Sequence, residues 1–510
     1  MSFLWLIKSE SYKKGTALSV LFNIISKGIL FLLTIIIARY FGSNIKTDIY
    51  FFVFGTMVLL SGFINSIDTA VLIPESMRLR EKEGGGSAAA FLNFFLLFYL
   101  ITGIAFIIVM YFFGTTVFGL ISKFSENDIV MYRNYFWIGS LFFIFQILTN
   151  YINAILTSLK YFSTPMIISG LNSCIVIAAI FLLKSEYDLL SIFIGGLVAY
   201  AVNLVILFFV MKKNAGWKFI ISYTGVTKKM VSNILYAALG QTATVASSLL
   251  PLYLLSGFGS GFISVMNYGK NIADIPNTLV TAQFTNVSGI KLNEQSARHD
   301  HAGMNDTFAR TSKLLVFILV PVGFYLFVFA EPMVELFYQN RNFNTDAVTA
   351  SAGFLKLLAL PVFCIGINAM VTRIFIAVQA IKQAFIYQVI MNGLQIISIW
   401  VFIKYIGAFG YGFAVITINI INLAGLFFIC RVIAPQINYS ALLKYTGLII
   451  LLNGLIAAAV YYAAGYLQTP VVFKLIVLFT VWLLILAVLN KYLHLDITIS
   501  LNLKNNKTVD

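Results

Sequence analysis

A few ionisable side chains interrupt the long apolar runs of this sequence. Lys27 lies in the first run, and Lys270 and Asp274 lie one helical turn apart in a later one. A charge at bilayer depth costs about 3 kcal/mol, so it normally faces a partner or a hydrated cavity. The spacing of Lys270 and Asp274 suits a helical ion pair. Two interpretations are open: a buried pair that neutralises itself, or a hydrated cavity where Lys27 and Lys270 bind an anionic headgroup and Asp274 tunes them.

Other polar side chains occur in the same or neighbouring apolar runs. In membrane helices such groups either line a hydrated pathway or make contacts between helices. We expect a polar cavity lining from five of them: Asn65, Asp68, Gln241, Asn267 and Asn271. Arg39 and Asp48 flank the first turn between runs and are candidates for an outer gate. A solvated loop also explains charge at that position.

The elements that must hold these residues are membrane helices. The chain has 510 residues, 60% hydrophobic and 10% charged, whereas soluble proteins have about a quarter of their residues charged. Its apolar runs are about 20 residues long, which is enough to span a bilayer. We predict an all-α polytopic membrane protein with about fourteen spans: 16–37, 49–73, 88–112, 135–159, 163–183, 189–211, 232–256, 261–290, 314–337, 347–372, 383–403, 409–430, 445–464 and 472–490.

The eighth span is the most polar, and the loop charges test whether it belongs in the count. With a cytoplasmic amino terminus, 23 of the 34 Lys and Arg fall in inner segments, eight in outer segments and three within spans. Omitting the eighth span would move the basic connection 291–313 to the outside. Because Lys and Arg accumulate on the cytoplasmic side, we predict that the eighth span crosses and that both termini are cytoplasmic. Polar connections are also expected at 74–87 and 212–231.

An internal repeat divides the chain. Phe41-Gly42-Ser43, after the first span, recurs as Phe258-Gly259-Ser260 after the seventh, and Asn172 in the fifth span matches Asn392 in the eleventh. Repeated bundles are common in transporters. We predict two like-oriented six-helix bundles around a central cavity, followed by two further helices. The expected segments are 1–211, an amphipathic cytoplasmic linker at 212–231, 232–430, and 431–510 with a short cytoplasmic tail.

Several classes of function are disfavoured by the sequence. It contains no zinc-protease, nucleophile-elbow or Walker motif, so we do not expect an enzyme or an ATP-driven pump. His299 and His301 have no acidic cluster beside them, so we expect no metal site and no cofactor. The net charge of +15 is concentrated in loops between spans, where membrane insertion explains it without a nucleic-acid partner.

Three stretches of sequence resemble a known family. They are Ala38-Arg39-Tyr40-Phe41-Gly42 running into Thr47-Asp48-Ile49-Tyr50-Phe51-Phe52; Asn267-Tyr268 followed by Ile275-Pro276; and Glu335-Leu336-Phe337-Tyr338 with Phe343, leading to Arg373-Ile374-Phe375-Ile376-Ala377. Their order and the arrangement of helices resemble the multidrug/oligosaccharidyl-lipid/polysaccharide exporter superfamily, and within it the MurJ (MviN) lipid II flippases. The resemblance covers the first twelve spans.

The resemblance implies a flippase that moves an undecaprenyl-diphosphate-linked glycan, lipid II, from the inner to the outer leaflet by alternating access. Cavity cations would hold the diphosphate. Lys27 falls where the family has a cavity arginine, Asp48 matches an aspartate at the outer turn, and Asp274 matches an acidic residue. It further implies a multi-pass protein of the bacterial inner membrane, driven by membrane potential or a monovalent cation; we expect a monomer whose partners are the bilayer and the lipid-linked oligosaccharide.

The chain also departs from the family pattern. Family arginines fall here on Leu33, Leu60, Ser61 and Asn271, and a family glutamate falls on Asn65. Lys270 is a candidate for a displaced cation. Two alternative functions therefore stay open: export of another lipid-linked unit, such as an O-antigen or exopolysaccharide, and, with the acidic residues Asp68 and Asp274 in its favour, multidrug/cation antiport.

Overall fold

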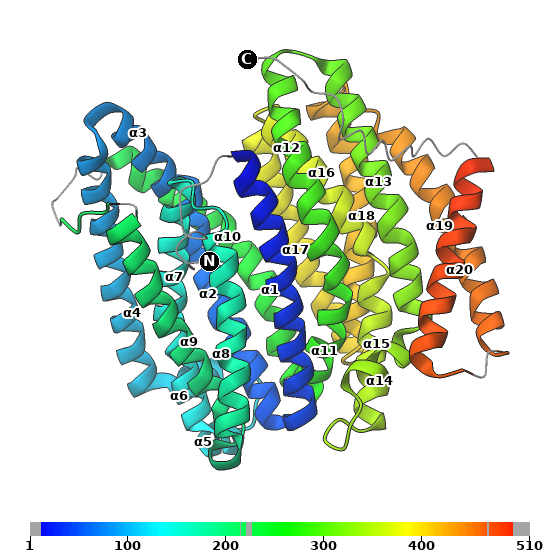
Figure 1. Cartoon of the computed structure of the whole chain (residues 1–510), viewed down its shortest axis with the longest axis horizontal. Coiled ribbons are helices and arrows are strands. Elements are labelled where there is room, and N and C mark those ends of the chain that lie inside the picture. Colours follow the sequence, from blue (N-terminus) through cyan, green and yellow to red (C-terminus); the bar gives the residue numbers. More distant parts are fainter. Residues whose placement is uncertain (1–11, 215, 221–226, 467–468, 493–510) are drawn as a thin grey trace. The chain divides into compact units, whose positions relative to one another are not determined.

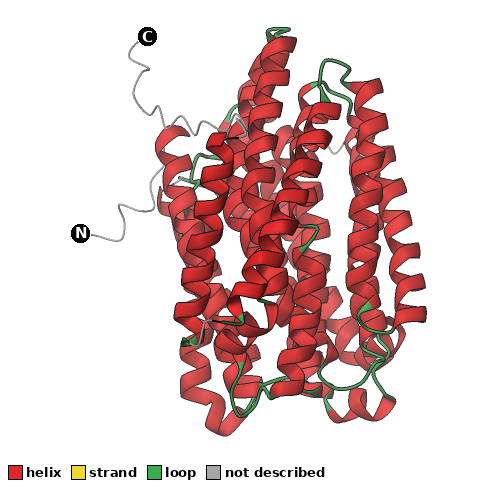
Figure 2. Ribbon diagram, turned by 90° about the vertical axis from the view of Figure 1, so that its right-hand side faces the viewer, coloured by secondary structure: helices red, strands yellow, loops and turns green. Residues whose placement is uncertain are grey.

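The computed structural model describes residues 12–214, 216–220, 227–466 and 469–492, and it is helical (Figures 1 and 2). Within these residues no strand forms; a single bridge pairs Asn340 with Phe343. Backbone groups in a bilayer must be satisfied within the chain, and helices achieve this segment by segment. The helices of unit-length runs are α1 (Tyr12–Phe41), α2 (Ile45–Ile67), α3 (Ile73–Glu83), α4 (Gly85–Ile121), α5 (Glu126–Met131), α6 (Arg133–Ser140), α7 (Phe142–Ser158), α8 (Thr164–Tyr187), α9 (Leu190–Phe209), α10 (Lys228–Leu255), α11 (Phe262–Pro276), α12 (Ala282–Ala297), α13 (His301–Val328), α14 (Ala330–Tyr338), α15 (Thr345–Ala359), α16 (Val362–Ala377), α17 (Ile381–Ile406), α18 (Gly410–Ile433), α19 (Tyr439–Ala464) and α20 (Val471–Tyr492).

The predicted fold class is confirmed. Thirteen helical segments of the described chain are long and apolar enough to cross a membrane, and each overlaps a predicted span. The ninth predicted span, 314–337, is displaced, because the apolar helix is His301–Val328 and α14 follows it as a separate helix. The eighth predicted span is also helical, because α11, a π-helical turn η4 (Asn277–Thr281) and α12 follow one another without a break. Its polar composition leaves it outside the thirteen. Pro276, which lacks a backbone N–H, directly precedes η4.

Two of the polar connections expected between spans, 74–87 and 291–313, are mostly helical and are not loops. The stretch 74–87 is helical on both sides of Gly84, and the stretch 291–313 is helical except for a short turn between α12 and α13. Helical hydrogen bonding does not require an apolar sequence, so helices extend past the apolar part of a run. Hydropathy marks the apolar stretch and not the end of the helix.

The predicted linker 212–231 is described in part. Residues 212–214 complete a π-helical turn η3 (Val210–Asn214), residues 216–220 have no regular structure, and 221–226 lie outside the described residues, as do 1–11 and the tail from 493 onward. Trp217 is buried, and its indole N–H donates to Asn93 Oδ1 on α4 at 2.8 Å. The Asn93 amide donates in return to the carbonyls of Lys218 and Ile220. One polar side chain thus anchors the start of this segment to α4.

The chain divides into two compact units. Unit 1 comprises Met1–Ile272, Phe337–Phe354 and Phe385–Ile418; unit 2 comprises Ala273–Leu336, Leu355–Ala384 and Asn419–Asp510. In unit 1, α8 packs against α1 and α9, and α2 packs against α7 and α10. Phe193 is central there, with ring centroids 5.4 Å from Tyr50 and 6.0 Å from Phe142. The bundle boundaries at 211, 232 and 430 stay a prediction.

Unit 2 has its own core around α13, which packs against α16 and α19. Trp482 on α20 is fully buried, and its indole N–H donates to Asn453 Oδ1 on α19 at 2.9 Å. The Tyr325 hydroxyl on α13 donates to the Leu475 carbonyl on α20 at 2.6 Å. Buried hydrogen bonds of this kind satisfy the polar ends of large aromatic side chains. They fix α19 and α20 to the rest of unit 2.

Candidate functional site

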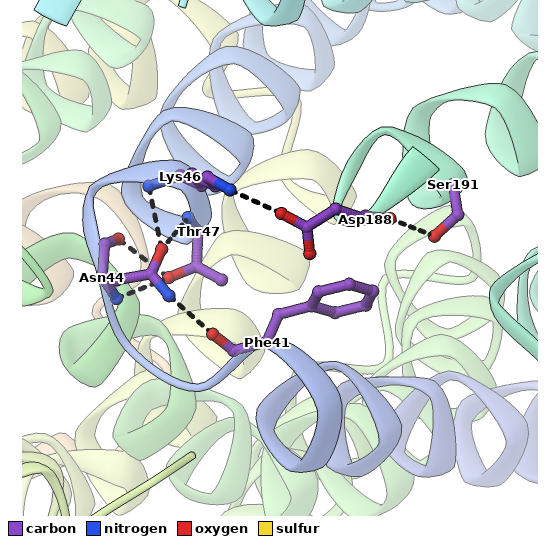
Figure 3. Close-up of polar contacts among 6 residues, drawn as sticks. All are labelled: Phe41, Asn44, Lys46, Thr47, Asp188 and Ser191. Atoms are coloured by element: carbon purple, nitrogen blue, oxygen red, sulfur yellow. Dashed lines mark hydrogen bonds and ion pairs between the residues drawn. The ribbon is translucent and has the colours of Figure 1, made fainter. Parts of the chain in front are cut away.

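The first turn between helices in unit 1 is held by a capping network (Figure 3). Asn44 is the N-cap of α2: its side-chain oxygen accepts from the backbone N–H groups of Lys46 and Thr47, and the Thr47 hydroxyl oxygen accepts from the Asn44 N–H. The Asn44 amide also donates to the Phe41 carbonyl at 2.7 Å. This reciprocal arrangement satisfies N–H groups that a helix start leaves without partners. The turn therefore presents Asp48 in a fixed direction.

Asp48 links this turn to the start of α11. Its side chain is 1% exposed. One carboxylate oxygen accepts from the Gly261 N–H at 2.6 Å, and the other accepts from the Ser264 N–H at 2.7 Å and the Ser264 hydroxyl at 2.5 Å. A carboxylate is stabilised there because helix N-termini carry free N–H donors and a partial positive charge. The buried charge is thus satisfied without a basic side chain among these contacts.

Two glycines permit the close approach of the connecting turns. Gly42 has φ +66°, and a Cβ there would overlap the Asn342 carbonyl oxygen. Gly261 has φ +96°, and a Cβ there would lie 3.2 Å from the Ser43 carbonyl oxygen. Both positions require a left-handed backbone, which glycine adopts without steric cost. The turns after α1 and α10, which carry the repeated Phe-Gly-Ser sequence, therefore lie against each other.

Tyr268 extends this contact along α11. Its hydroxyl donates to the Gly42 carbonyl at 3.0 Å, and its side chain is fully buried. Its ring lies edge-on to Phe51 at 5.3 Å and Phe343 at 5.2 Å, and 5.1 Å from the Tyr338 ring. Each such aromatic contact contributes about 1 kcal/mol beyond the area that it buries.

The turn between α14 and α15 completes the contact. The Asn342 side-chain amide donates to the carbonyls of Arg39 at 3.0 Å and Tyr40 at 3.2 Å. We call Gly42, Asp48, Gly261, Ser264, Tyr268 and Asn342 the closing cluster. The Arg39 side chain is exposed, so Arg39 takes part through its backbone carbonyl. Of the two residues predicted for an outer gate, Asp48 is the one whose side chain joins separate segments.

An ion pair lies beside the closing cluster. Lys46 Nζ contacts Asp188 Oδ2 at 2.5 Å, and Asp188 precedes α9, where its carbonyl accepts from the Ser191 hydroxyl (Figure 3). The two side chains are 38% and 56% exposed. Exposed pairs of this kind contribute at most about 1 kcal/mol. The pair borders a pocket of about 420 Å³ that Tyr40, Tyr132 and Asn342 also line.

The predicted cavity cations lie on the helices that meet at the closing cluster. Lys27 is half-buried on α1, and Lys270 and Asp274 are half-buried on α11. Beside Lys27, Ser26 is buried against α8, where its hydroxyl donates to the Met166 carbonyl at 2.5 Å. Among the described residues Lys27 makes no hydrogen bond or ion pair.

Asp68 has a different environment. It is fully buried at the start of a π-helical turn η2 (Asp68–Leu72), where the Tyr99 hydroxyl of α4 donates to Oδ1 at 2.5 Å. Its Oδ2 has no hydrogen-bond partner within the described part of the chain. The Tyr99 ring lies edge-on to Tyr151 at 5.0 Å, and the Tyr151 hydroxyl donates to the Leu92 carbonyl. Asp68 is thereby held inside unit 1 against α4.

The other predicted lining residues are spread over three helices. Asn65 is half-buried on α2, Gln241 on α10, and Asn267 and Asn271 on α11. The Asn267 amide donates to the Ile263 carbonyl of its own helix at 2.9 Å. All four lie in unit 1, and α2 packs directly against α10.

Sequence reasoning named Asp48 but missed its partners. Gly261 and Ser264 lie 213 and 216 positions further along the chain. The repeated Phe-Gly-Ser sequence is the signal that marks both turns. Tyr268 and Phe343 belong to the stretches that carry the family resemblance, and the structure places them together in the closing cluster and its aromatic contacts.

Comparison with known proteins identifies relatives over about three quarters of the chain. A sequence model described as lipid II flippase MurJ matches residues 37–479. A probable lipid II flippase MurJ of Borreliella burgdorferi is 21% identical over 390 residues, which cover 76% of this chain and 77% of that protein. A probable lipid II flippase MurJ of Buchnera aphidicola is 24% identical over 413 residues, covering 74% and 76%.

Solved structures share the fold. A structure titled "Lipid II flippase MurJ, inward closed conformation" superposes with a TM-score of 0.77 at 19% identity, covering 93% of this chain and 100% of that one. An inward-facing multidrug resistance MATE family transporter of the MOP superfamily superposes with a TM-score of 0.64 at 15% identity, covering 83% and 96%. The predicted exporter fold is therefore confirmed.

The closing cluster predicts that replacing Asp48 opens the turn. We expect Asp48→Ala to raise the rate at which a maleimide labels Ser43→Cys about tenfold, because a carboxylate with three hydrogen bonds is lost. The measurement uses purified protein in which Cys174, Cys364 and Cys430 are replaced by alanine. Asp188→Ala, which removes only the exposed ion pair, is the matched control. Equal labelling rates with and without Asp48 would contradict the closing role.

The Asp68 environment predicts coupling between two residues. We expect Tyr99→Phe to lower stability by about 2 kcal/mol, because it removes the donor to a buried carboxyl group. Adding Asp68→Leu should restore part of the lost stability, since no polar group is then left unsatisfied. Melting in detergent measures both, with Tyr111→Phe, on an exposed face of α4, as control. Additive losses from the two substitutions would rule out the coupling.

Proposed function

The chain belongs to the lipid II flippase MurJ family, and on that basis we propose that it carries the peptidoglycan precursor lipid II from the inner to the outer leaflet of the bacterial inner membrane. The observation that carries the proposal is the family match over residues 37–479. That range begins just before the first turn of the closing cluster and extends into α20. The match therefore includes the element that we infer to open and close.

The closing cluster has the chemistry of a reversible closure. The turns of α1–α2, α10–α11 and α14–α15 are joined by hydrogen bonds: the Asp48 carboxylate accepts from the Gly261 N–H, and backbone carbonyls accept from the Tyr268 hydroxyl and the Asn342 amide. Water can replace such bonds when the turns separate, so the net free energy of opening is much smaller than the sum of the bonds. An apolar contact of equal area would expose its surface without compensation. We infer that this end opens to release the transported lipid.

Lys27 and Lys270 are the residues that we propose to hold the diphosphate. Two phosphates carry about two negative charges, and removing them from water without cations would cost several kcal/mol. Both lysines are half-buried in unit 1, and Lys27 makes no ion pair with the described residues. A half-buried ammonium is attracted to a phosphate more strongly than a fully hydrated one, because water screens it less. Asp274, on the same helix as Lys270, would moderate that charge.

The remaining features of the proposal follow from membership of a transporter family. We propose that the chain acts as a monomer, with both termini in the cytoplasm, and that membrane potential or a monovalent cation drives the cycle. We propose no enzymatic step and no cofactor. The excess of Lys and Arg in the predicted inner segments supports the orientation.

A second candidate is the export of another lipid-linked glycan. It is favoured by the positions where the family has arginines and this chain has Leu33, Leu60, Ser61 and Asn271. Ser61 is buried, and its hydroxyl donates to Gln146 Oε1 at 3.0 Å. That position therefore serves packing between α2 and α7 in this chain. Fewer cations would suit a substrate with a different headgroup.

Complementation tests the proposed function. The chain is expressed in a bacterial host depleted of its own lipid II flippase, with the amount of protein matched by immunoblot. We expect growth to be rescued and lipid II to be exposed on the outer leaflet. Lysis and absent exposure in cells that express the protein well would contradict lipid II transport and leave the second candidate.

The anion-binding proposal makes a separate prediction about the lysines. We expect Lys27→Ala and Lys270→Ala each to reduce transport at least about tenfold, since a charge-assisted hydrogen bond contributes about 2 kcal/mol. Exposed lysines at other positions, Lys404 and Lys444, are the matched controls. Transport is measured as lipid II exposure per amount of protein. If all four variants have the same activity, these two lysines do not hold the diphosphate.

A further inference from the structure

Unit 2 contains a pocket that none of the candidate site residues described above lines. It has a volume of about 680 Å³ and is formed by α14, α15 and the ends of α19 and α20 that face each other across the α19–α20 connection. Its apolar wall includes Phe329, Val471 and Leu475. Four charged side chains also line it: Glu331, Glu335, Lys356 and Lys474.

The walls of this pocket are held in place by buried contacts. Phe329 and Leu475 belong to one apolar cluster with Trp482. The Tyr325 hydroxyl bonds to the Leu475 carbonyl, and the Trp482 indole bonds to Asn453. These contacts join α13, α19 and α20. The pocket is therefore a preformed feature, and a ligand does not have to build it.

The charges in the pocket are balanced but not paired. Within the described part of the chain, none of the four makes an ion pair with a partner within 4.0 Å. Two carboxylates and two ammonium groups therefore share one pocket and remain available. A purely anionic ligand would face the two glutamates, and a purely cationic one would face the two lysines. The arrangement is complementary to a ligand that carries both charges.

Three tyrosines border the same pocket: Tyr461, Tyr462 and Tyr466, with exposed fractions of 68%, 71% and 73%. Tyr461 and Tyr462 lie in the last turn of α19 and Tyr466 follows its end; the Tyr466 hydroxyl donates to the Tyr462 hydroxyl at 3.0 Å. Exposed tyrosines at the end of a membrane helix are typical of the headgroup level of a bilayer. The tyrosine side of the pocket is thus at the depth where lipid headgroups lie.

We propose that this pocket binds the headgroup of phosphatidylethanolamine, a zwitterionic phospholipid with a primary ammonium. Lys356 and Lys474 receive the phosphate, and Glu331 and Glu335 receive the ammonium. A primary ammonium has three N–H donors for carboxylates, whereas the quaternary ammonium of phosphatidylcholine has none. The apolar wall contacts the glycerol and the first part of the acyl chains. This site is distinct from the one that we propose for the transported lipid.

Native mass spectrometry of the purified full-length protein tests the proposal. Phosphatidylethanolamine, phosphatidylcholine and phosphatidylglycerol are added at equal concentration, and the retained lipid is counted. We expect phosphatidylethanolamine to be retained about tenfold more than either other lipid, as the loss of one charge-assisted hydrogen bond predicts. Equal retention of the three lipids would overturn the proposal. So would a preference for phosphatidylcholine, which would assign the site to the tyrosine rings.

Variants show whether the preference belongs to this pocket. Glu331→Gln with Glu335→Gln, and Lys356→Gln with Lys474→Gln, should each abolish the preference for phosphatidylethanolamine. Lys291→Gln with Glu294→Gln, an exposed opposite-charge pair on α12 in the same unit, should retain it. A preference unchanged in both pocket variants would overturn the proposal. If a variant does not fold, the comparison of the three lipids on the wild-type protein still tests the proposal. Its result does not depend on whether the chain complements a missing lipid II flippase.

A soluble headgroup separates a lipid site from a site for a small zwitterion. Glycerophosphoethanolamine carries the same phosphate and ammonium without acyl chains. We expect it to displace the retained lipid only at a concentration at least about tenfold higher, because it lacks the apolar contacts. Displacement at an equal concentration would contradict a lipid site and assign the pocket to a soluble compound.

Discussion

The arrangement of unit 1 depends on the buried carboxylate of Asp48. The charge is compensated by hydrogen-bond donors at the start of α11, and those donors have no other partner in the helix because they belong to its first turn. The Asp48 carboxylate therefore requires these N–H donors, and the donors require the carboxylate. If the carboxylate withdrew without water replacing it, a buried charge and free N–H groups would both be left unsatisfied. The positions of the turns after α1 and α10 follow from this mutual requirement.

The kind of contact also distinguishes the closing cluster, which we infer to open, from the apolar core of unit 2. The closing cluster joins turns of unit 1 by hydrogen bonds, which water can replace once the turns separate. The core of unit 2 around Trp482 and Tyr325 consists mainly of apolar contacts among α13, α19 and α20, reinforced by buried hydrogen bonds. Opening that core would expose its apolar side chains.

The sequence was sufficient to predict the helices and the class of protein, because membrane insertion imposes a strong hydropathy signal. It does not predict where helices end, so the expected polar connection 291–313 proves to be helical outside one short turn. Asp48 could be named from its position at a turn. Its partners Gly261 and Ser264 could not, because contacts between residues more than 200 positions apart depend on the packing of helices. The repeated Phe-Gly-Ser sequence identified the turns but not their contact.

Because the sequence does not reveal helix packing, it also does not show which polar side chains line a cavity and which bond to a neighbouring helix. Asp68 is one of the residues expected to line a cavity, and Ser61 occupies a position where the family has an arginine. In the structure Asp68 accepts a hydrogen bond from Tyr99 on α4, and Ser61 donates one to Gln146 on α7. Their polarity serves contacts between helices. A diphosphate carries about two negative charges, and two lysines balance them when water is excluded and screening is weak. Under the role proposed for Lys27 and Lys270, binding therefore does not require the additional arginines of the family.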